Sequence, residues 1–147
     1  MKKIIFALLF SVLCSNLFAT AALPKGWLND YDAALQQAKK ENKYVYVLFV
    51  GSDWCGWCKK LQHDILDKNE FKKFAKEKML LVYCDFPRSS KVSEAQKIRQ
   101  LNWMRQLGGD GGVPLAVIVD SDGKVAGRIG GYLPLKDYIN KLKSIVK

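Results

Sequence analysis

Two cysteines, Cys55 and Cys58, stand where a strand-like pattern gives way to a helical one. Residues 44–50 (YVYVLFV) are β-branched, aromatic and aliphatic, which is typical of a buried strand. From Lys59 onward the pattern is helical, so both thiols are expected on the first turn of a helix. Unpaired backbone N–H groups and the helix dipole favour a thiolate at Cys55 there, and Cys58 is close enough to resolve a mixed disulfide. A strand, a CxxC pair and a helix in this order indicate a redox site.

Two tryptophans, Trp54 and Trp57, flank and divide the cysteine pair. A working CxxC loop has to be exposed, so we predict that both indoles shield the site and offer apolar surface to a substrate; the alternative is that both belong to the core. The residues between the cysteines, Gly56 and Trp57, carry no charge. Only the helix dipole and Lys59 remain to stabilise a thiolate, which favours a reducing dithiol over a strongly oxidising one.

The remaining cysteine and histidine residues do not suggest a metal site. The chain has four cysteines, of which Cys84 ends the apolar run 79–83, and its one histidine is His63. A structural zinc site usually takes two closely spaced ligand pairs, so we predict neither a metal nor another cofactor. Cys84 is interpreted as a buried, inert strand residue, with a third redox-active thiol as the alternative. His63 is predicted to lie on the surface.

The first residues have the pattern of an export signal. Lys2 and Lys3 precede an apolar segment over 4–13, and the small residues at 19–21 (ATA) suit cleavage after Ala21. We therefore expect residues 1–21 to be a signal peptide and residues 22–147 to be one exported domain, in a compartment where disulfides persist. For a Gram-negative cell that compartment is the periplasm.

Two alternatives to a cleaved signal peptide are open. An uncleaved membrane anchor needs about 20 apolar residues, but polar residues at 11, 15 and 16 interrupt this segment. A lipoprotein could be attached through Cys14, yet the preceding Leu13 is bulky where such sites prefer a small residue.

Size and charge exclude further function classes. Residues 22–147 suffice for one domain with a proper core, and a separate dimerisation domain does not fit within them, which predicts a monomer. The formal net charge of the chain is +10, but its lysines alternate with acidic residues and no basic–aromatic pattern is present. The chain is therefore not expected to bind nucleic acid.

Helical and strand-like patterns alternate along the rest of the chain. Their order, α-β-α-β-α-β-β-α, predicts an α/β fold in which a mixed sheet is flanked by helices on both faces. The helix that follows the CxxC pair is expected to break near Leu66 and to restart at a capping box over 67–70. The predicted helices cover 30–42, 59–66, 67–78, 92–107 and the segment from 134 onward; the predicted strands are 44–50, 79–85, 115–119 and 124–129.

One of these helices is predicted from a repeat of apolar residues. The apolar side chains recur every third residue and precede Gly108-Gly109, which suits a helix end. The repeating residues are Val92, Ala95, Ile98, Leu101, Met104 and Leu107.

Together these motifs resemble the thioredoxin-fold thiol:disulfide oxidoreductases, over nearly all of residues 22–147. The resemblance rests on 54–58 (WCGWC) after a strand, on Val113-Pro114 before a strand, and on the 122–123 (DG) hairpin followed by a terminal helix. The segments 85–87 (DFP) and 130–132 (GGY) further resemble exported bacterial disulfide reductases, including the chlamydial DsbH type.

The resemblance implies a thioredoxin fold with Pro114 in the cis form beside the CxxC pair. Val113 and Pro114 would then offer backbone groups to an extended substrate segment, as in strand addition. Cys55 would be the nucleophile and Cys58 the resolving thiol, with protein disulfides as substrates and a membrane protein as electron donor. A disulfide oxidase or isomerase of the same fold is the alternative within this class. A redox-inert peptide-binding module is the alternative outside it.

One departure from the family pattern concerns proton transfer. Family members commonly hold a buried aspartate six residues before the first cysteine, where this chain has Phe49. Removal of the proton from Cys58 must therefore use water, a lysine or another group.

Overall fold

The computed structural model describes residues 23–89 and 91–147. The predicted signal peptide 1–21, its cleavage site and Cys14 lie outside these residues, so they stay predictions. Within the described part of the chain, no helix has the length and apolar character needed to cross a bilayer.

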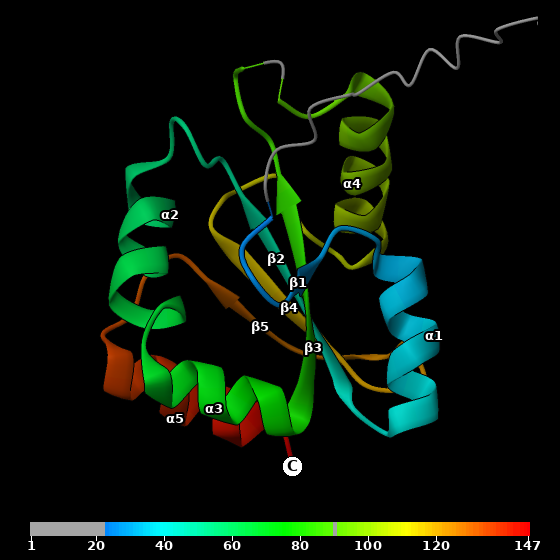
Figure 1. The fold of residues 1–147 in the computed structure, drawn as a ribbon, viewed down its shortest axis with the longest axis vertical. Helices are drawn as coiled ribbons and strands as arrows, with labels where there is room; N and C mark the ends of the chain where they lie inside the picture. The colour runs from blue at the N-terminus through cyan, green and yellow to red at the C-terminus, as the bar shows by residue number, and fades with distance from the viewer. Residues whose placement is uncertain (1–22, 90) are drawn as a thin grey trace, which may run out of the picture.

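A five-stranded mixed sheet in the order β1-β3-β2-β4-β5 forms the centre of the molecule (Figure 1). β2 pairs with β3 in parallel and with β4 in antiparallel orientation, and β4 and β5 form an antiparallel hairpin. The predicted mixed sheet is thereby confirmed. The sequence patterns missed β1, a two-residue edge strand parallel to β3. The strands are β1 (Trp27–Leu28), β2 (Tyr44–Val50), β3 (Met79–Asp85), β4 (Leu115–Val119) and β5 (Val125–Gly130).

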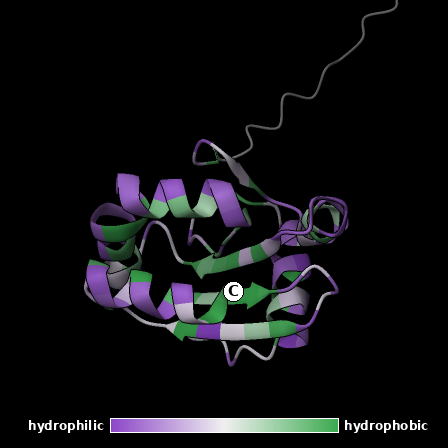
Figure 2. Ribbon diagram, turned by 90° about the horizontal axis from the view of Figure 1, so that it is seen from below, coloured by the Kyte–Doolittle hydropathy of each residue, from purple (hydrophilic) through white to green (hydrophobic). Residues whose placement is uncertain are grey.

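Helices cover both faces of this sheet, as the α/β prediction requires. Figure 1 shows α1 and α4 beside one face and α2, α3 and α5 on the other. In Figure 2 the helices turn hydrophilic residues outward, while the strands between them are rich in hydrophobic residues. The helices are α1 (Tyr31–Glu41), α2 (Gly56–Leu61), the π-helix η1 (Gln62–Leu66), α3 (Asn69–Lys78), α4 (Glu94–Gln106) and α5 (Leu135–Ile145).

Strand β2 connects the two hydrophobic cores. Successive side chains of a strand point to opposite faces, so Tyr46 and Leu48 pack with α2, α3 and α5, while Val47 and Phe49 pack with α1 and α4. All four side chains are fully buried, which explains the uninterrupted apolar sequence of the strand. The end of β2 is therefore firmly held at the point where the CxxC loop begins.

The apolar repeat does form a helix, but its residues do not share one face. Ile98 is 58% exposed and Leu101 is also exposed, whereas Trp103 and Met104 are buried. Steps of three residues fall about 60° short of a full turn each time, so six such residues wind around the helix. The buried face of α4 also includes the amide side chain of Gln100.

The predicted capping box is wrong, although the helix does break after Leu66. η1 continues directly from α2, and α3 begins at Asn69 with Lys68 at its N-cap and no side-chain capping bond. Asp67 precedes the N-cap position, and its Oδ1 accepts a hydrogen bond from Gln62 Nε2 (2.7 Å) instead. The carboxylate thus joins the two ends of η1.

Candidate active site

The CxxC pair lies at the start of α2, as the sequence predicts. Cys55 is the N-cap of α2 and Cys58 lies within its first turn, and a disulfide joins them. The Cys55 Sγ accepts a hydrogen bond from the Cys58 backbone N–H at 3.1 Å. One of the N–H groups that a helix start leaves unpaired is thereby directed at the sulfur of Cys55, an arrangement that stabilises negative charge there.

The indole of Trp54, which follows β2, is held against the loop that follows β3. Its indole Nε1 donates to the Phe86 carbonyl (2.7 Å), and the Arg88 guanidinium carbon lies 5.4 Å from the ring centroid. The indole packs so closely on Gly51 that a Cβ at that position would overlap it. Trp54 is nevertheless 42% exposed, so it does not belong to the core.

Trp57 is 60% exposed and contacts an aromatic residue from the opposite side of the site. Its ring centroid lies 5.6 Å from that of Tyr132, which follows β5. The Tyr132 hydroxyl donates to Asp64 Oδ2 at 3.0 Å, and Lys60 Nζ donates to the same oxygen at 2.6 Å. Hydrogen bonds from Lys60, His63 and Tyr132, in that order of effect, hold the pKa of the Asp64 carboxyl far below its usual range. The exposed His63 ring belongs to this surface network, so its predicted surface position is confirmed.

The loop before β4 brings Val113 and Pro114 to the cysteine pair. The peptide bond between them is cis, as the family resemblance implies. The Val113 carbonyl oxygen lies 3.9 Å from Cys55 Sγ, and the Pro114 carbonyl accepts a hydrogen bond from the Gly131 N–H (2.8 Å). The fold therefore places Val113 beside Cys55, although 58 positions separate them in the sequence, while Trp54 and Trp57 belong to the same short segment as Cys55.

Two aspartates at the ends of neighbouring parallel strands were missed as site residues. Asp85, the last residue of β3, accepts hydrogen bonds from the backbone N–H (2.9 Å) and the hydroxyl (2.5 Å) of Ser52. In return, Asp53 accepts from the backbone N–H groups of Arg88 and Ser89, both at 3.0 Å. The Arg88 bond is the largest cause that lowers the pKa of the Asp53 carboxyl. A carboxylate beside each strand end was the only sequence signal for this reciprocal contact.

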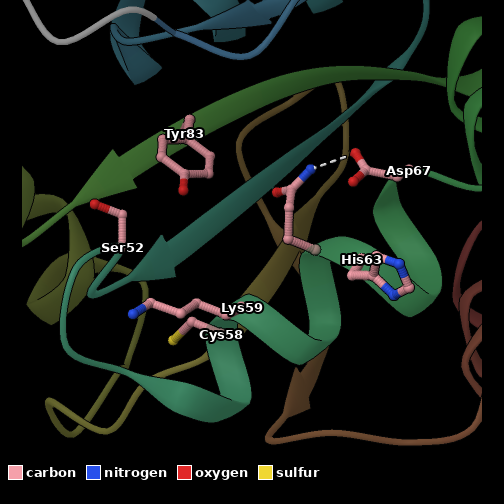
Figure 3. Close-up of a pocket in the computed structure, with 7 residues that line it drawn as sticks. Ser52, Cys58, Lys59, His63, Asp67 and Tyr83 are labelled. Atoms are coloured by element: carbon pink, nitrogen blue, oxygen red, sulfur yellow. Dashed lines mark hydrogen bonds between the residues drawn. The ribbon is translucent and has the colours of Figure 1, made fainter.

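A cavity of about 190 Å³ opens beside Cys58 (Figure 3). Its walls come from the end of β2, from α2, from η1 and from β3. Burial, followed by the charge of Asp85, raises the pKa of the Tyr83 phenol in its wall to about 12. The lining residues are Ser52, Cys58, Lys59, Gln62, His63, Asp67 and Tyr83.

Cys84 lies in the other core, on the α1 and α4 side of the sheet, and is fully buried. Burial strongly raises the pKa of its thiol, so it stays protonated near neutral pH. Within residues 23–89 and 91–147, no group of three or more His, Cys, Asp or Glu side chains is arranged to hold a metal ion.

Replacing Cys84 with alanine should leave disulfide reduction within about twofold of the wild-type rate. The variant should lose about 1 kcal/mol of unfolding free energy, because a small buried side chain is truncated. Urea unfolding and a turnover assay on the same preparation measure both effects. A folded variant that has lost activity would place Cys84 in the mechanism.

The sheet, the CxxC pair at a helix start and the cis-proline loop beside it together define a thiol:disulfide oxidoreductase of the thioredoxin fold. Residues 31–145 match the family model described as a thioredoxin-like domain, and the chain belongs to this family. It is of the Dsb type within that class, as its relatives indicate.

Three similar proteins carry Dsb names. The disulfide bond reductase DsbH of Chlamydia pneumoniae is 36% identical over 119 residues, which cover 80% of this chain and 70% of that protein. A solved structure of a DsbH oxidoreductase superimposes with a TM-score of 0.74 at 33% identity and covers 91% of each chain. The thioredoxin-related protein DsbJ of Chlamydia pneumoniae is 34% identical over 76 residues, 52% of this chain but only 21% of DsbJ.

Proposed function

We propose that this protein is an exported enzyme that reduces disulfides in other proteins with the dithiol of Cys55 and Cys58. The observation that carries the proposal is the hydrogen bond from the Cys58 N–H to Cys55 Sγ at the start of α2. This bond can stabilise a thiolate at Cys55 without the help of a metal or cofactor. A relative that bears the name disulfide bond reductase supports the same direction of electron flow.

In the proposed reaction, each of the two cysteine sulfurs makes one nucleophilic attack. The Cys55 thiolate attacks one sulfur of the substrate disulfide, so a Cys55–substrate disulfide forms and the other substrate sulfur leaves as a thiolate. Cys58 then loses its proton and attacks Cys55 Sγ. The Cys55–Cys58 disulfide forms, the second substrate sulfur leaves, and two electrons have passed from the enzyme to the substrate. The oxidised pair is the form present in this structure.

The direction follows from how strongly the thiolate is stabilised. A strong oxidase stabilises its reduced thiolate heavily, commonly with a cation next to the sulfur. Here Gly56 and Trp57 separate the two cysteines, and the Lys59 ammonium donates to the Asp53 carbonyl at 3.2 Å. When the thiolate is only moderately stabilised, the disulfide form of the pair is comparatively stable. The dithiol then tends to donate its electrons to a substrate disulfide.

Four residues around Cys55 are proposed to bind the substrate. Trp54 and Trp57 provide exposed indole surface on two sides, and their exposure supports a role in contact with another protein. Val113, next to Pro114, has its carbonyl oxygen close to Cys55 Sγ and can pair with the backbone of an extended segment. Such backbone pairing accepts many sequences, which suits an enzyme with several protein substrates.

The cellular setting completes the proposal. The predicted signal peptide supports export to the periplasm, with an anchored or lipid-attached form as the less favoured alternative. Each turnover leaves the enzyme oxidised, so a membrane protein is proposed as the electron donor. A monomer is proposed, because an exposed site that serves large substrates needs no second copy.

An insulin-reduction assay with dithiothreitol tests this function. We expect the protein to accelerate the precipitation of the insulin B chain, whereas a redox-inert peptide-binding module gives the uncatalysed rate. The matched control is the double variant Cys55→Ser/Cys58→Ser, which keeps the fold and lacks both thiols. Acceleration that is equal in the control and the wild type would contradict the proposal.

A further inference from the structure

Asp85 carries a buried carboxylate that has no role in the proposed attacks of Cys55 and Cys58. It is 8% exposed and ends β3 at the same edge of the sheet as the CxxC loop. Burial of a carboxylate costs free energy unless hydrogen bonds compensate. Both side-chain oxygens of Asp85 bond to one residue, Ser52, through its N–H and its hydroxyl.

Ser52 connects this carboxylate to the cavity beside Cys58. Ser52 and Cys58 both line the cavity, and Figure 3 shows them at the same end of it. A volume of about 190 Å³ is large enough for water molecules, and polar groups line it. Cys58 is 4% exposed and lines this cavity, so water held there gives its proton a route out of the site.

Two groups near Cys58 are donors and cannot take up its proton. Lys59 carries an ammonium group, which donates to the Asp53 carbonyl. The pKa of the Tyr83 phenol, raised to about 12 by burial, keeps that group protonated near neutral pH.

Two further groups lie at the far end of the cavity. Figure 3 shows His63 and Asp67 on the side away from Ser52 and Cys58. Asp67 is exposed and accepts a hydrogen bond from Gln62, and the exposed His63 ring bonds to Asp64. Asp85, reached through Ser52, is the carboxylate at the end where Cys58 lies.

We propose that Ser52 and Asp85 take up the proton of Cys58 when this thiol resolves the mixed disulfide. A water molecule in the cavity accepts the proton of the Cys58 thiol and passes one to Ser52 Oγ. Ser52 transfers its own hydroxyl proton to Asp85 Oδ2, to which it already donates at 2.5 Å. The Cys58 thiolate attacks Cys55 Sγ, and the substrate sulfur leaves as a thiolate that takes a proton from solvent. Asp85 then returns its proton along the same route.

A reaction with Ellman's reagent, an aromatic disulfide, separates the two thiol steps. Attack by Cys55 on the reagent releases one coloured thiolate, and attack by Cys58 on Cys55 releases the second. The second phase is intramolecular, so its rate does not depend on reagent concentration. In stopped-flow measurements at pH 7, Asp85→Asn and Ser52→Ala should slow the second phase at least tenfold and leave the first within twofold.

Three controls make this test specific. Ser52→Thr keeps a hydroxyl and should restore most of the second-phase rate, which a purely structural role of Ser52 does not predict. Asp67→Asn changes the carboxylate at the far end of the cavity and should leave both phases unchanged. If Asp85→Asn fails to fold by circular dichroism, the Ser52→Ala and Ser52→Thr pair decides the question.

Because this inference rests on the proposed dithiol chemistry, the two can fail separately. A wild-type protein without a first phase would contradict the proposed function. A normal first phase, with a second phase that Asp85→Asn and Ser52→Ala leave unchanged or accelerate, would overturn the proton route alone. Equal slowing of the second phase by Asp67→Asn would overturn it as well.

Discussion

A Cys55→Ser variant is expected to lose disulfide reduction altogether, while a Cys58→Ser variant should accumulate mixed disulfides with its substrates. The reason is the order of attack, because Cys55 Sγ receives the N–H of Cys58 and lies beside the Val113 carbonyl, whereas Cys58 lies within the first turn of α2 and lines the cavity. Insulin reduction measures the first effect. Non-reducing electrophoresis and mass spectrometry of the Cys58→Ser variant, incubated with a disulfide-bonded protein, measure the second.

Labelling with iodoacetamide at pH 7 provides an independent check of these roles. In the reduced wild-type protein, Cys55 should be alkylated first and Cys84 should stay unmodified, because Cys84 is fully buried. A Cys84→Ser variant serves as the matched control for the loss of a thiol away from the site. Alkylation of Cys58 together with an unreactive Cys55 would mean that the two roles are reversed.

The reduction potential of the Cys55–Cys58 pair should lie nearer to the roughly −270 mV of a reducing thioredoxin than to the roughly −120 mV of a strong oxidase. The difference between these limits, about 150 mV, corresponds to about 7 kcal/mol for a two-electron couple. Equilibration with glutathione buffers, read out by the fluorescence of Trp54 and Trp57 or by alkylation, measures the potential. A value above about −150 mV would contradict the reductase assignment and favour the oxidase alternative.

A substitution at Trp57 tests why the potential lies where it does. Trp57→His should shift the potential toward oxidising values, since an imidazolium next to Cys58 favours the reduced thiolate form. Trp57→Phe is the matched control, because it keeps an aromatic ring against Tyr132 and adds no charge. An equal shift in both variants would assign the effect to the loss of the indole and its exclusion of water, rather than to charge.

The parts of the fold that local patterns determine were predictable from the sequence. β2 is buried on both faces and therefore reads as one apolar run, and the CxxC pair follows it at the start of a helix. The turn at Asp120, whose carboxylate accepts from the N–H groups of Asp122 and Lys124, likewise has a local signature. The cis form of Pro114 followed from the family resemblance alone, because X–Pro bonds are predominantly trans in general.

The features that escaped prediction depend on contacts between distant residues. The bond between Ser52 and Asp85 spans 33 positions and that between Tyr132 and Asp64 spans 68, so no short window of sequence contains either one. The two-residue strand β1 exists only through its pairing with β3. In α4, the winding of the apolar residues around the helix could be calculated, but which side faces the sheet depends on packing against Tyr31 and its neighbours.

The short spacing of the two bonded cysteines limits how much the stability of the protein depends on the disulfide. A bond between residues three positions apart closes a ring of only about four residues, and so restricts the unfolded chain by only about 2 kcal/mol in conformational entropy, against about 4.7 for a 100-residue loop. The cohesion of the molecule comes instead from the two apolar layers on either side of β2. The bond can therefore open and close while the scaffold around it keeps its shape.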